Sequence, residues 1–503
     1  MKSNFIVVKN CEVTNLKNVP KLNFEEFKEQ VVEFVEDGER VASFFVYPEK
    51  ENLFNLIIVL ANDKEGILKI FSTEVKSSYK SITPSATQLH WFEREIYEQW
   101  GILPEKHPFL KPIRFHNRYN EKNEKEILPS VTNFFQIEGE EIHEVAVGPV
   151  HAGIIEPGHF RFQCHGEDVF HLEISLGYQH RGIEKRLIGG PDKRSIHYME
   201  TIAGDTTIGH TLAYCYALES LSKTKVSVRE EIIRGILLEL ERLANHTGDL
   251  GALANDVGYL PTASYCGRLR GDFLNITALI CGNRFGRNVV RPGGVSFDLS
   301  QELIKEIEKR LIETFKDVRN AIDLLFGSNL VVERFEEIGI LNKEKAIEIG
   351  LVGVAARASG LEIDSRINFP VGPYQFTKIP ISIYNTGDVF ARAFVRWLEI
   401  QRSVDFVLDS LKKLLNDNTK LSEKKNFPEL EKNSIVVSLV EGWRGEICHT
   451  VITDKNGNFR HYKIVDPSFH NWFGLALALR GEEISNFPLC NKSFNLSYCG
   501  HDL

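Results

Sequence analysis

The sequence predicts an α+β protein in which a small N-terminal α+β domain precedes a large helix-rich domain. First, the initial 116 or so residues combine one amphipathic helical segment with short runs rich in Val, Ile and Phe. Second, the polar stretch Asn117–Glu126 has no apolar periodicity and resembles a linker. Third, several long amphipathic segments follow it. We therefore expect domains over residues 1–120 and 141–503, joined by a linker over residues 121–140.

The composition is that of a globular protein with a large core, since 43% of its 503 residues are hydrophobic and 26% are charged. The net charge of −9 argues against a nucleic-acid partner, which would require a basic face. The most apolar run, Leu53–Ala61, is far shorter than the roughly 18–20 residues that span a bilayer. We therefore expect no transmembrane segment of the chain's own. Eight scattered cysteines form no CxxC motif, so we expect reduced thiols.

The first expected elements are a helix and three strands. Phe24–Val35 has amphipathic helical spacing, and the β-branched and aromatic runs Arg40–Tyr47, Leu53–Ala61 and Leu68–Val75 predict strands.

A distinctive motif, WFEREIYEQWGILPEKHPFL, begins at Trp91. Its first half has helical spacing, Gly101 ends the helix, and three prolines favour an extended tail. The motif resembles the signature of the small peripheral-arm subunit of respiratory complex I, lettered C in bacteria, and of its counterpart in related membrane-bound hydrogenases. That family usually has an acidic residue after its His-Pro pair, where this chain has Phe109. The resemblance implies a docking domain without a cofactor.

The larger region begins near Val145 with a segment rich in Gly and Pro, and it continues mostly in helices. A turn and a buried helix are expected over Tyr198–Glu219, because capping residues precede apolar residues at helical spacing. Further helices are expected at Val228–His246, Gln301–Phe326 and Asp388–Leu411, and alternating strands over Ser434–Val465.

The common catalytic signatures are missing from the sequence. It contains no HExxH or paired-cysteine zinc motif, no GxGxxG or phosphate loop, and no GxSxG elbow. These absences argue against zinc chemistry, direct dinucleotide or ATP binding, and serine-hydrolase chemistry.

A second set of motifs occurs in a fixed order: GPxHxxxxEPGHFR, YxHRGxEK, GHxLAY, ELERxxxH, NDVG, RPGGV, ASG and DPSF. This set resembles the large subunit shared by complex I, where it is lettered D, and the membrane-bound [NiFe] hydrogenases, including formate hydrogenlyase and hydrogenase-4. Together with the N-terminal motif, the resemblance covers nearly the whole chain. It implies a fused C/D-type large subunit at the cytoplasmic face of the cell membrane, held peripherally by an iron–sulfur small subunit and by membrane antiporter-like and anchor subunits.

The ligands of a nickel–iron site are missing from the positions that the resemblance assigns to them. The site requires four cysteine thiolates, which the family supplies as two CxxC pairs. The first pair falls on Ala203 and Thr206, and the second on Ser468 and Asn471. The resemblance therefore predicts no nickel, no metal site and no hydrogen chemistry in this chain, with iron–sulfur clusters only in a partner subunit.

A quinone site is the alternative that the resemblance raises. Complex I binds a quinone in the same cavity through a histidine and a tyrosine, and here those positions hold Pro157 and Gly204. His159 and His210 are the nearby candidates for a quinone or acceptor pocket. The remaining cavity candidates for catalysis are His151, Glu156, Asp205, Thr206, Asp466, Ser468 and His470.

Other charged residues are expected to form structural ion pairs. The segment His180–Lys185 predicts a buried charge network around a helix start, and further charges interrupt apolar helices or loops at Asp256, Arg357, Asp364, Asp388, Arg392 and Arg396.

Four functions remain open at this point. The first is a large subunit in electron transfer coupled to ion translocation, without a nickel–iron site. The second is a quinone-reducing subunit of an NADH-dehydrogenase-type complex, and the third is a redox-inert scaffold or coupling subunit. The fourth, an active hydrogenase, requires that the cysteine positions be misaligned.

Overall fold

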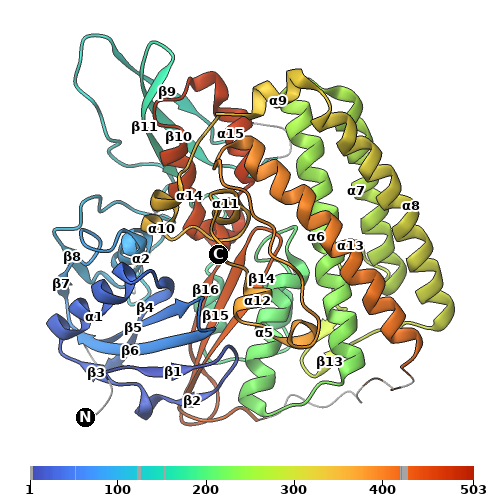
Figure 1. The fold of residues 1–503 in the computed structure, drawn as a ribbon. Coiled ribbons are helices and arrows are strands. Elements are labelled where there is room, and N and C mark those ends of the chain that lie inside the picture. The colour runs from blue at the N-terminus through green and yellow to red at the C-terminus, as the bar shows by residue number, and fades with distance from the viewer. Residues whose placement is uncertain are drawn as a thin grey trace.

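The computed structural model describes residues 4–50, 52–121, 126–151, 155–417, 419, 421 and 429–503. It confirms the predicted α+β class: an N-terminal sheet lies on one side of the C-terminal strands, and a group of long helices lies on the other (Figure 1). Residues 122–125 of the predicted linker and 152–154 of the GPxHxxxxEPGHFR motif lie outside the described residues.

The N-terminal sheet has the strand order β1-β6-β5-β4, and β3 pairs with β6 in parallel. Helix α1 covers one face, where the Phe27 ring packs on Phe44 and Phe71. The predicted helix and three strands are confirmed, each with ends shifted by no more than three residues. The bounds are β1 Ile6–Val8, β2 Thr14–Asn15, η1 Leu16–Asn18, β3 Lys21–Leu22, α1 Phe24–Glu36, β4 Arg40–Lys50, β5 Leu53–Asn62, β6 Ile67–Val75 and β7 Ser78–Lys80.

The WFERE motif forms α2, His90–Trp100, and Gly101 ends it in the left-handed region at φ 72°. The glutamates of this helix bind neighbouring loops. Glu93 accepts from the backbone N–H of Ile82 at 2.9 Å, and Glu98 accepts from that of Phe115 at 2.7 Å. The motif is therefore structural, since its carboxylates fix the loops on both sides of the helix. Two short elements flank α2: η2 Thr87–Leu89 and β8 Leu103–Glu105.

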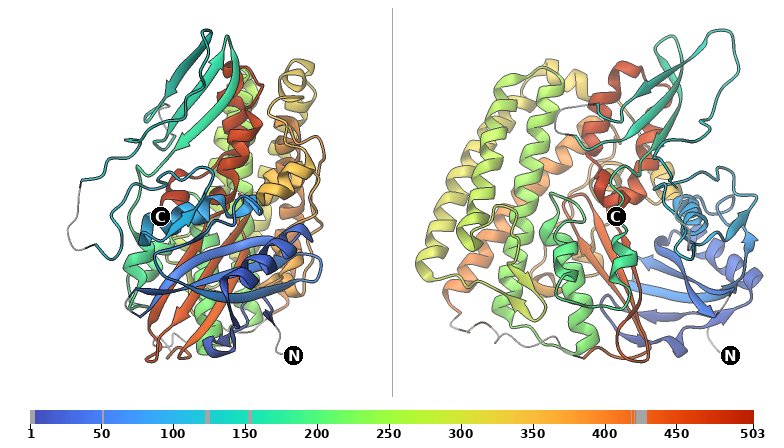
Figure 2. Two further views of the ribbon diagram at one scale, coloured as in Figure 1. Left: turned by 90° about the vertical axis from the view of Figure 1, so that its left-hand side faces the viewer. Right: turned by 180° about the vertical axis from the view of Figure 1, so that it is seen from behind.

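A three-stranded antiparallel sheet, ordered β11-β10-β9, projects at the top of the molecule (Figures 1 and 2). Its strands are β9 Ile142–Val147, β10 His159–His165 and β11 Asp168–Ser175. Two short helices follow, α3 Ile183–Leu187 and α4 Ser195–Met199.

Four long helices, α6, α7, α8 and α13, pack side by side beyond the central strands (Figure 2). Helix α6 extends ten residues past the predicted end at His246. A glycine such as Gly251 usually disfavours a helix, but here it lies within α6. Its missing side chain lets α7 approach closely, because a Cβ there would lie 2.6 Å from Cys266. No helix within the described ranges is long and apolar enough to cross a membrane. The bounds are α5 Thr207–Ser222, α6 Val228–Asp256, α7 Leu260–Cys281, α8 Gln301–Phe326 and α13 Val389–Leu415.

Shorter elements connect these helices to one another and to the strands. They are β12 Val290–Arg291, β13 Gly294–Val295, α9 Asn329–Phe335, α10 Lys343–Ile349, α11 Gly353–Ala358, α12 Ser365–Asn368 and η3 Gly372–Gln375.

The central sheet joins the two ends of the chain. Strands β14 Ser434–Glu441, β15 Glu446–Thr453 and β16 Phe459–Val465 are antiparallel, and the N-terminal strand β2 pairs with β14. The two predicted domains therefore share a sheet, while the boundaries at 120 and 141 stay a prediction. The remaining elements are α14 Pro467–Ala478, η4 Ile484–Asn486, α15 Phe487–Phe494 and α16 Tyr498–Asp502.

A buried ion triad adds to the contact between the two regions. Lys463 of β16 donates to Glu95 of α2 at 2.6 Å and to Glu184 of α3 at 3.0 Å, and all three side chains are almost fully buried. Glu184 also accepts from the backbone N–H of Ile464. This arrangement confirms the predicted buried charge at the start of α3 for Glu184, whereas Arg181 and Lys185 of the same segment are exposed.

The first turn of α5 depends on a carboxyl group from α6. Glu241 accepts from the backbone N–H of Ile208 at 2.7 Å and from that of Gly209 at 3.2 Å. These are donors that a helix N-terminus leaves without intrahelical partners. Burial raises the pKa of Glu241 to about 8.

Replacing the buried lysine tests the ion triad. In Lys463→Met, two buried carboxylates lose their common cation, which should cost about 3–5 kcal/mol. Calorimetry should therefore show a clearly lower melting temperature. The matched control is Lys345→Met, whose exposed pair with Glu348 contributes about 0–1 kcal/mol. Equal melting temperatures for the two variants would contradict the proposed role of the triad.

The raised pKa of Glu241 predicts a pH dependence of stability. The folded chain retains a proton on Glu241 that the unfolded chain loses above about pH 4.5. The stabilisation is therefore complete below that pH and is lost progressively as the pH rises to about 8. We expect the melting temperature to fall more between pH 5 and pH 8 for the wild type than for Glu241→Gln, which remains neutral. The exposed substitution Glu313→Gln is the control and should behave as the wild type does.

Candidate functional site

The candidate site is built around the turn Thr201–Thr206, which connects α4 to α5. The backbone N–H of Thr206 donates to the Ala203 carbonyl at 3.1 Å and closes the turn. Ala203 and Thr206 are buried, Gly204 is exposed and Asp205 is half-buried. The middle of the turn is thus open to the surface, while its two ends face the interior.

Asp205 and Thr206 bind the hairpin turn that connects β14 to β15. Arg444 donates through both terminal nitrogens to Asp205, at 2.6 and 2.7 Å, and its guanidinium lies 3.9 Å above the Trp443 ring. The Trp443 indole donates to the Thr206 hydroxyl at 3.1 Å. Burial alone would raise the pKa of Asp205, but the Arg444 charge lowers it below its ordinary value. A fixed ion pair therefore lies at this turn. The sequence motifs gave no indication of Trp443 or Arg444.

The C-terminal segment lies against the other side of the turn. Arg181 donates to the Ile202 carbonyl at 2.8 Å and to the Cys499 carbonyl at 3.0 Å, so one guanidinium joins the two segments. The Cys499 thiol interacts with the Gly204 backbone, and burial raises the pKa of this thiol to about 12. Cys499 is therefore a neutral thiol at physiological pH.

The two other aligned ligand positions have structural partners. The Ser468 hydroxyl accepts from the backbone N–H of Ser497 at 2.8 Å. The Asn471 amide exchanges two hydrogen bonds, both of 3.1 Å, with the backbone of Val352. The structure also sets Cys499 directly against the turn. The reason is that α14 to α16 fold back and return the chain to the turn.

His210 connects helix α5 with Asp466, the residue that caps α14. Its Nε2 lies 3.0 Å from Asp466 Oδ2, and its Nδ1 lies 3.1 Å from Nε2 of His449. The Nδ1 of His449 lies 2.8 Å from the Tyr462 hydroxyl. All four side chains are buried. The structure thus brings together two of the candidates, His210 and Asp466, and adds His449 and Tyr462, which no sequence spacing indicated.

Burial and charge set the protonation states along this chain of groups. Burial, and then the neighbouring His210, hold the pKa of His449 well below its ordinary value, so His449 is neutral. Burial would raise the pKa of Asp466, but the hydrogen bond and charge of His210, followed by the Arg444 charge, lower it. Asp466 is therefore an ionised acceptor.

Three further candidates lie around α16 and the adjoining sheet. Glu156 accepts from the backbone N–H of Tyr498 at 2.9 Å, and His151 lies 3.1 Å from the Tyr498 hydroxyl. His159 accepts from Arg161 at 3.2 Å. The last candidate, His470, is buried with its ring edge-on to Phe92, and burial lowers its pKa to about 3.

Helix α16 packs closely against the neighbours of both histidines of the predicted quinone pocket. A Cβ on Gly158, next to His159, would lie 2.5 Å from the Tyr498 ring, whereas a Cβ on Gly500 would lie 2.7 Å from Asp466, the partner of His210. The cavity beside Asp205, lined by Ile208, Glu241, Asn245 and Arg270 among others, has a volume of about 10 Å³. That is room for about one water, whereas ligand pockets measure roughly 300–1,000 Å³.

The donors at the turn do not fit a nickel–iron centre, which requires soft thiolates. Ala203 carries no donor atom, Thr206 offers only a hydroxyl, and Cys499 is a single protonated thiol. Across the part of the chain that the structure describes, no group of three or more His, Cys, Asp and Glu side chains could hold a metal ion.

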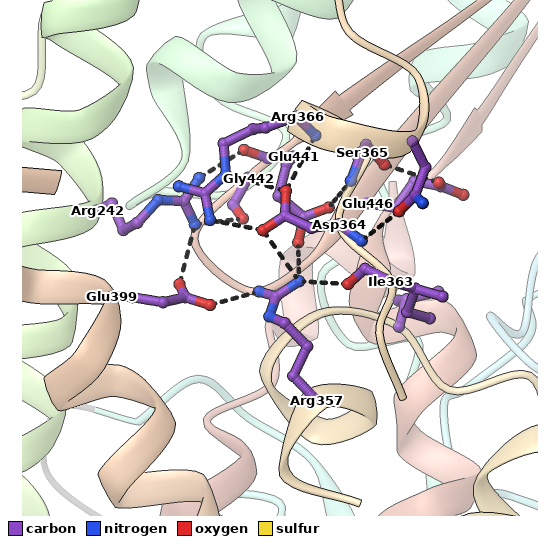
Figure 3. Close-up of polar contacts among 12 residues, drawn as sticks. Arg242, Arg357, Ile363, Asp364, Ser365, Arg366, Glu399, Glu441, Gly442 and Glu446 are labelled. Atoms are coloured by element: carbon purple, nitrogen blue, oxygen red, sulfur yellow. Dashed lines mark hydrogen bonds and ion pairs between the residues drawn. The ribbon is translucent and has the colours of Figure 1, made fainter. Parts of the chain in front are cut away.

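A buried charge network lies behind the hairpin turn (Figure 3). Glu441 accepts from Arg357 at 2.7 Å and from the backbone N–H of Ser365 at 3.0 Å, while Arg242 donates to the Glu441 carbonyl. Arg357 also pairs with Glu399 at 2.7 Å. The predicted ion pairing is confirmed for Arg357 and also for Asp364 and Arg396.

Two of the predicted ion pairs involve neutral partners instead. Arg392 donates to the Ser493 hydroxyl at 2.8 Å and to the carbonyls of Gly339 and Gly387. Asp388 accepts from the backbone N–H of Ala391 and caps α13. A helix N-terminus and converging carbonyls thus stabilise these charges, so no oppositely charged side chain is required.

Comparison with known proteins accounts for both halves of the chain. The family model described as "Respiratory-chain NADH dehydrogenase, 30 Kd subunit" matches residues 15–131, and that described as "Respiratory-chain NADH dehydrogenase, 49 Kd subunit" matches residues 256–436.

Curated relatives include both hydrogenase and NADH-quinone oxidoreductase subunits. The carbon monoxide-induced hydrogenase of Rhodospirillum rubrum is 28% identical over 354 residues, which is 70% of this chain and 97% of the relative. NADH-quinone oxidoreductase subunit 4 of Thermus thermophilus is 29% identical over 368 residues, 68% of this chain and 90% of the relative. The fused C/D polypeptide of NADH-quinone oxidoreductase from Bacteroides thetaiotaomicron is 27% identical over 456 residues, 83% of this chain and 84% of the relative. The chain belongs to the family of fused C/D-type large subunits of complex I and the membrane-bound [NiFe] hydrogenases.

Proposed function

We propose that this chain is the large subunit of a complex-I-like, hydrogenase-related membrane oxidoreductase complex, and that it has no functional nickel–iron site. Its role is in electron transfer coupled to ion translocation. The relatives named as hydrogenase and NADH-quinone oxidoreductase subunits support the redox role. The observation that carries the loss of nickel is the turn itself, where Ala203, Thr206 and the Asp205–Arg444 ion pair stand in place of thiolates.

The partners follow from the same proposal. An iron–sulfur small subunit supplies the clusters, and membrane antiporter-like and anchor subunits hold the complex at the cytoplasmic face of the membrane. The exposed backbone of Gly204 and the half-buried Asp205 support docking at the turn, because a redox partner can approach both of them closely.

A redox-inert scaffold is the second candidate. It is supported by the close packing of the site, since the cavity beside Asp205 has room for about one water. The third candidate is a quinone-reducing subunit with its pocket at His159 and His210.

Metal analysis of the purified complex tests the loss of the nickel site. We expect iron from the clusters of the partner subunit but no stoichiometric nickel, because a single protonated thiol cannot replace four thiolates. A nickel-containing hydrogenase of this family, purified alongside, is the control. One nickel per chain would contradict the proposal and favour the active hydrogenase.

Titration of the purified complex with acceptors separates the three remaining functions. For electron transfer, we expect turnover with an added acceptor, and we expect His165→Gln, on the exposed end of β10, to leave it unchanged. Saturable turnover with short-chain quinones that both His159→Gln and His210→Gln abolish would identify the quinone-reducing subunit. If the intact complex shows no turnover with any donor and acceptor, the scaffold is favoured.

A further inference from the structure

A continuous line of hydrogen-bonding groups runs from the candidate site into the interior. Asp466, His210, His449 and Tyr462 come from the N-cap of α14, from α5, from β15 and from β16. Consecutive polar atoms in this line are 3.0, 3.1 and 2.8 Å apart. Each distance is that of a direct hydrogen bond, so no water is needed between neighbours.

The hydrogen bonds have a consistent direction. Ionised Asp466 can only accept, so His210 donates to it from Nε2. When His210 carries a single proton, neutral His449 donates from its Nε2 to the Nδ1 of His210, and its own Nδ1 accepts from the Tyr462 hydroxyl. In that state every donor in the line points toward Asp466. If His210 gained a proton on Nδ1, it would donate to His449 Nε2, and His449 would in turn donate from its Nδ1 to the Tyr462 hydroxyl oxygen. No heavy atom would have to move.

Both ends of the line lead toward the surface. Asp466 is close to Arg444, whose partner Asp205 is half-exposed. At the other end, the ring centroids of Tyr462 and Tyr214 are 6.3 Å apart. The buried Tyr214 hydroxyl makes no direct hydrogen bond in the described structure, although Ser195 lies beside it. Buried polar groups of this kind are commonly satisfied by a buried water.

The path continues from Ser195 to solvent. The Ser195 hydroxyl donates to Asp192 at 3.2 Å, and Asp192 is exposed at the surface. The serine and the surface carboxylate thus lie on the Tyr214 side of the four buried groups.

We propose that Tyr462, His449 and His210 form a proton relay that connects the surface at Asp192 with Asp466 at the candidate site. In one transfer, the Tyr462 proton moves to His449 Nδ1, the His449 Nε2 proton moves to His210 Nδ1, and the His210 Nε2 proton moves to Asp466. Tyr462 is reprotonated from the Ser195 side. One proton enters at the surface, one reaches Asp466 and no electron moves. The relay rests on the proposed electron-transfer function, because that function supplies the acceptor that takes up this proton.

The first test uses the purified complex with two kinds of acceptor. A short-chain quinone takes up protons together with electrons, whereas ferricyanide takes up electrons only. We expect Tyr462→Phe and His449→Gln to lower quinone reduction by about 10²-fold, the lower range for general acid–base catalysis, and to leave ferricyanide reduction unchanged. The matched control is Tyr216→Phe in α5, which loses a hydroxyl bonded to Glu231 at 2.9 Å but leaves the relay intact. Equal losses with both acceptors, or with the control, would overturn the relay.

The second test needs no turnover. Deuterium exchange of the His449 ring N–H is followed by ¹⁵N NMR on the full chain. The double variant His210→Gln/Tyr462→Phe isolates His449 from both neighbours, and we expect its exchange to slow by about tenfold or more. A loosened structure would instead exchange faster, so the sign separates the relay from a purely structural role. Slower exchange without turnover would keep the relay and refute the proposed electron transfer. Unchanged or faster exchange would refute the relay.

Discussion

The hairpin turn Glu441–Glu446 joins the main parts of the molecule through buried ion pairs. A buried charge requires compensation by an opposite charge or by converging hydrogen bonds, and each charge of this turn has an oppositely charged partner from another segment. Glu446 binds Arg40 of the N-terminal sheet, Glu441 binds Arg357, and Arg444 binds Asp205. The carbonyls of the turn accept from Arg242 of α6. One short turn therefore fixes the N-terminal sheet, the helices and the candidate site relative to one another. Figure 3 shows the part of this arrangement around Glu441, Arg242 and Arg357.

This constraint also determines the chemistry of the site. The close approach of the hairpin to α11 requires Gly353, where a Cβ would lie 2.0 Å from the Arg444 carbonyl. Arg444 is thereby held over the turn, where it keeps Asp205 ionised. A cationic side chain paired with a carboxylate thus lies at the turn to which the resemblance assigns the first cysteine pair. This ion pair suits acid–base and electrostatic roles, for which the proposed relay from Tyr462 to His210 would supply protons.

The fused arrangement links the N-terminal region to the site through a shared sheet. Strand β2 extends the central sheet, and Lys463 pairs with Glu95 of α2 next to Tyr462 of the proposed relay. Movement of the N-terminal region would strain this sheet and break buried ion pairs, which costs about 3–5 kcal/mol per pair. A partner bound to the N-terminal region would therefore act on the same strands that carry the relay, as a coupling subunit requires.

The amino-acid sequence was sufficient to predict the class of the fold, several of its long helices and strands, and the absence of the cysteine pairs, but it did not indicate helix α7 or the strands β9 to β11. Local periodicity was enough for α1 and α8, because their apolar residues recur on one face whatever the rest of the chain does. It failed for the end of α6, where Gly251 serves packing against Cys266. Arg444, His449, Tyr462 and the position of Cys499 became evident only from the tertiary structure. These residues are isolated in the sequence and follow no motif, and folding alone brings them within hydrogen-bonding distance of Asp205, His210 and the turn.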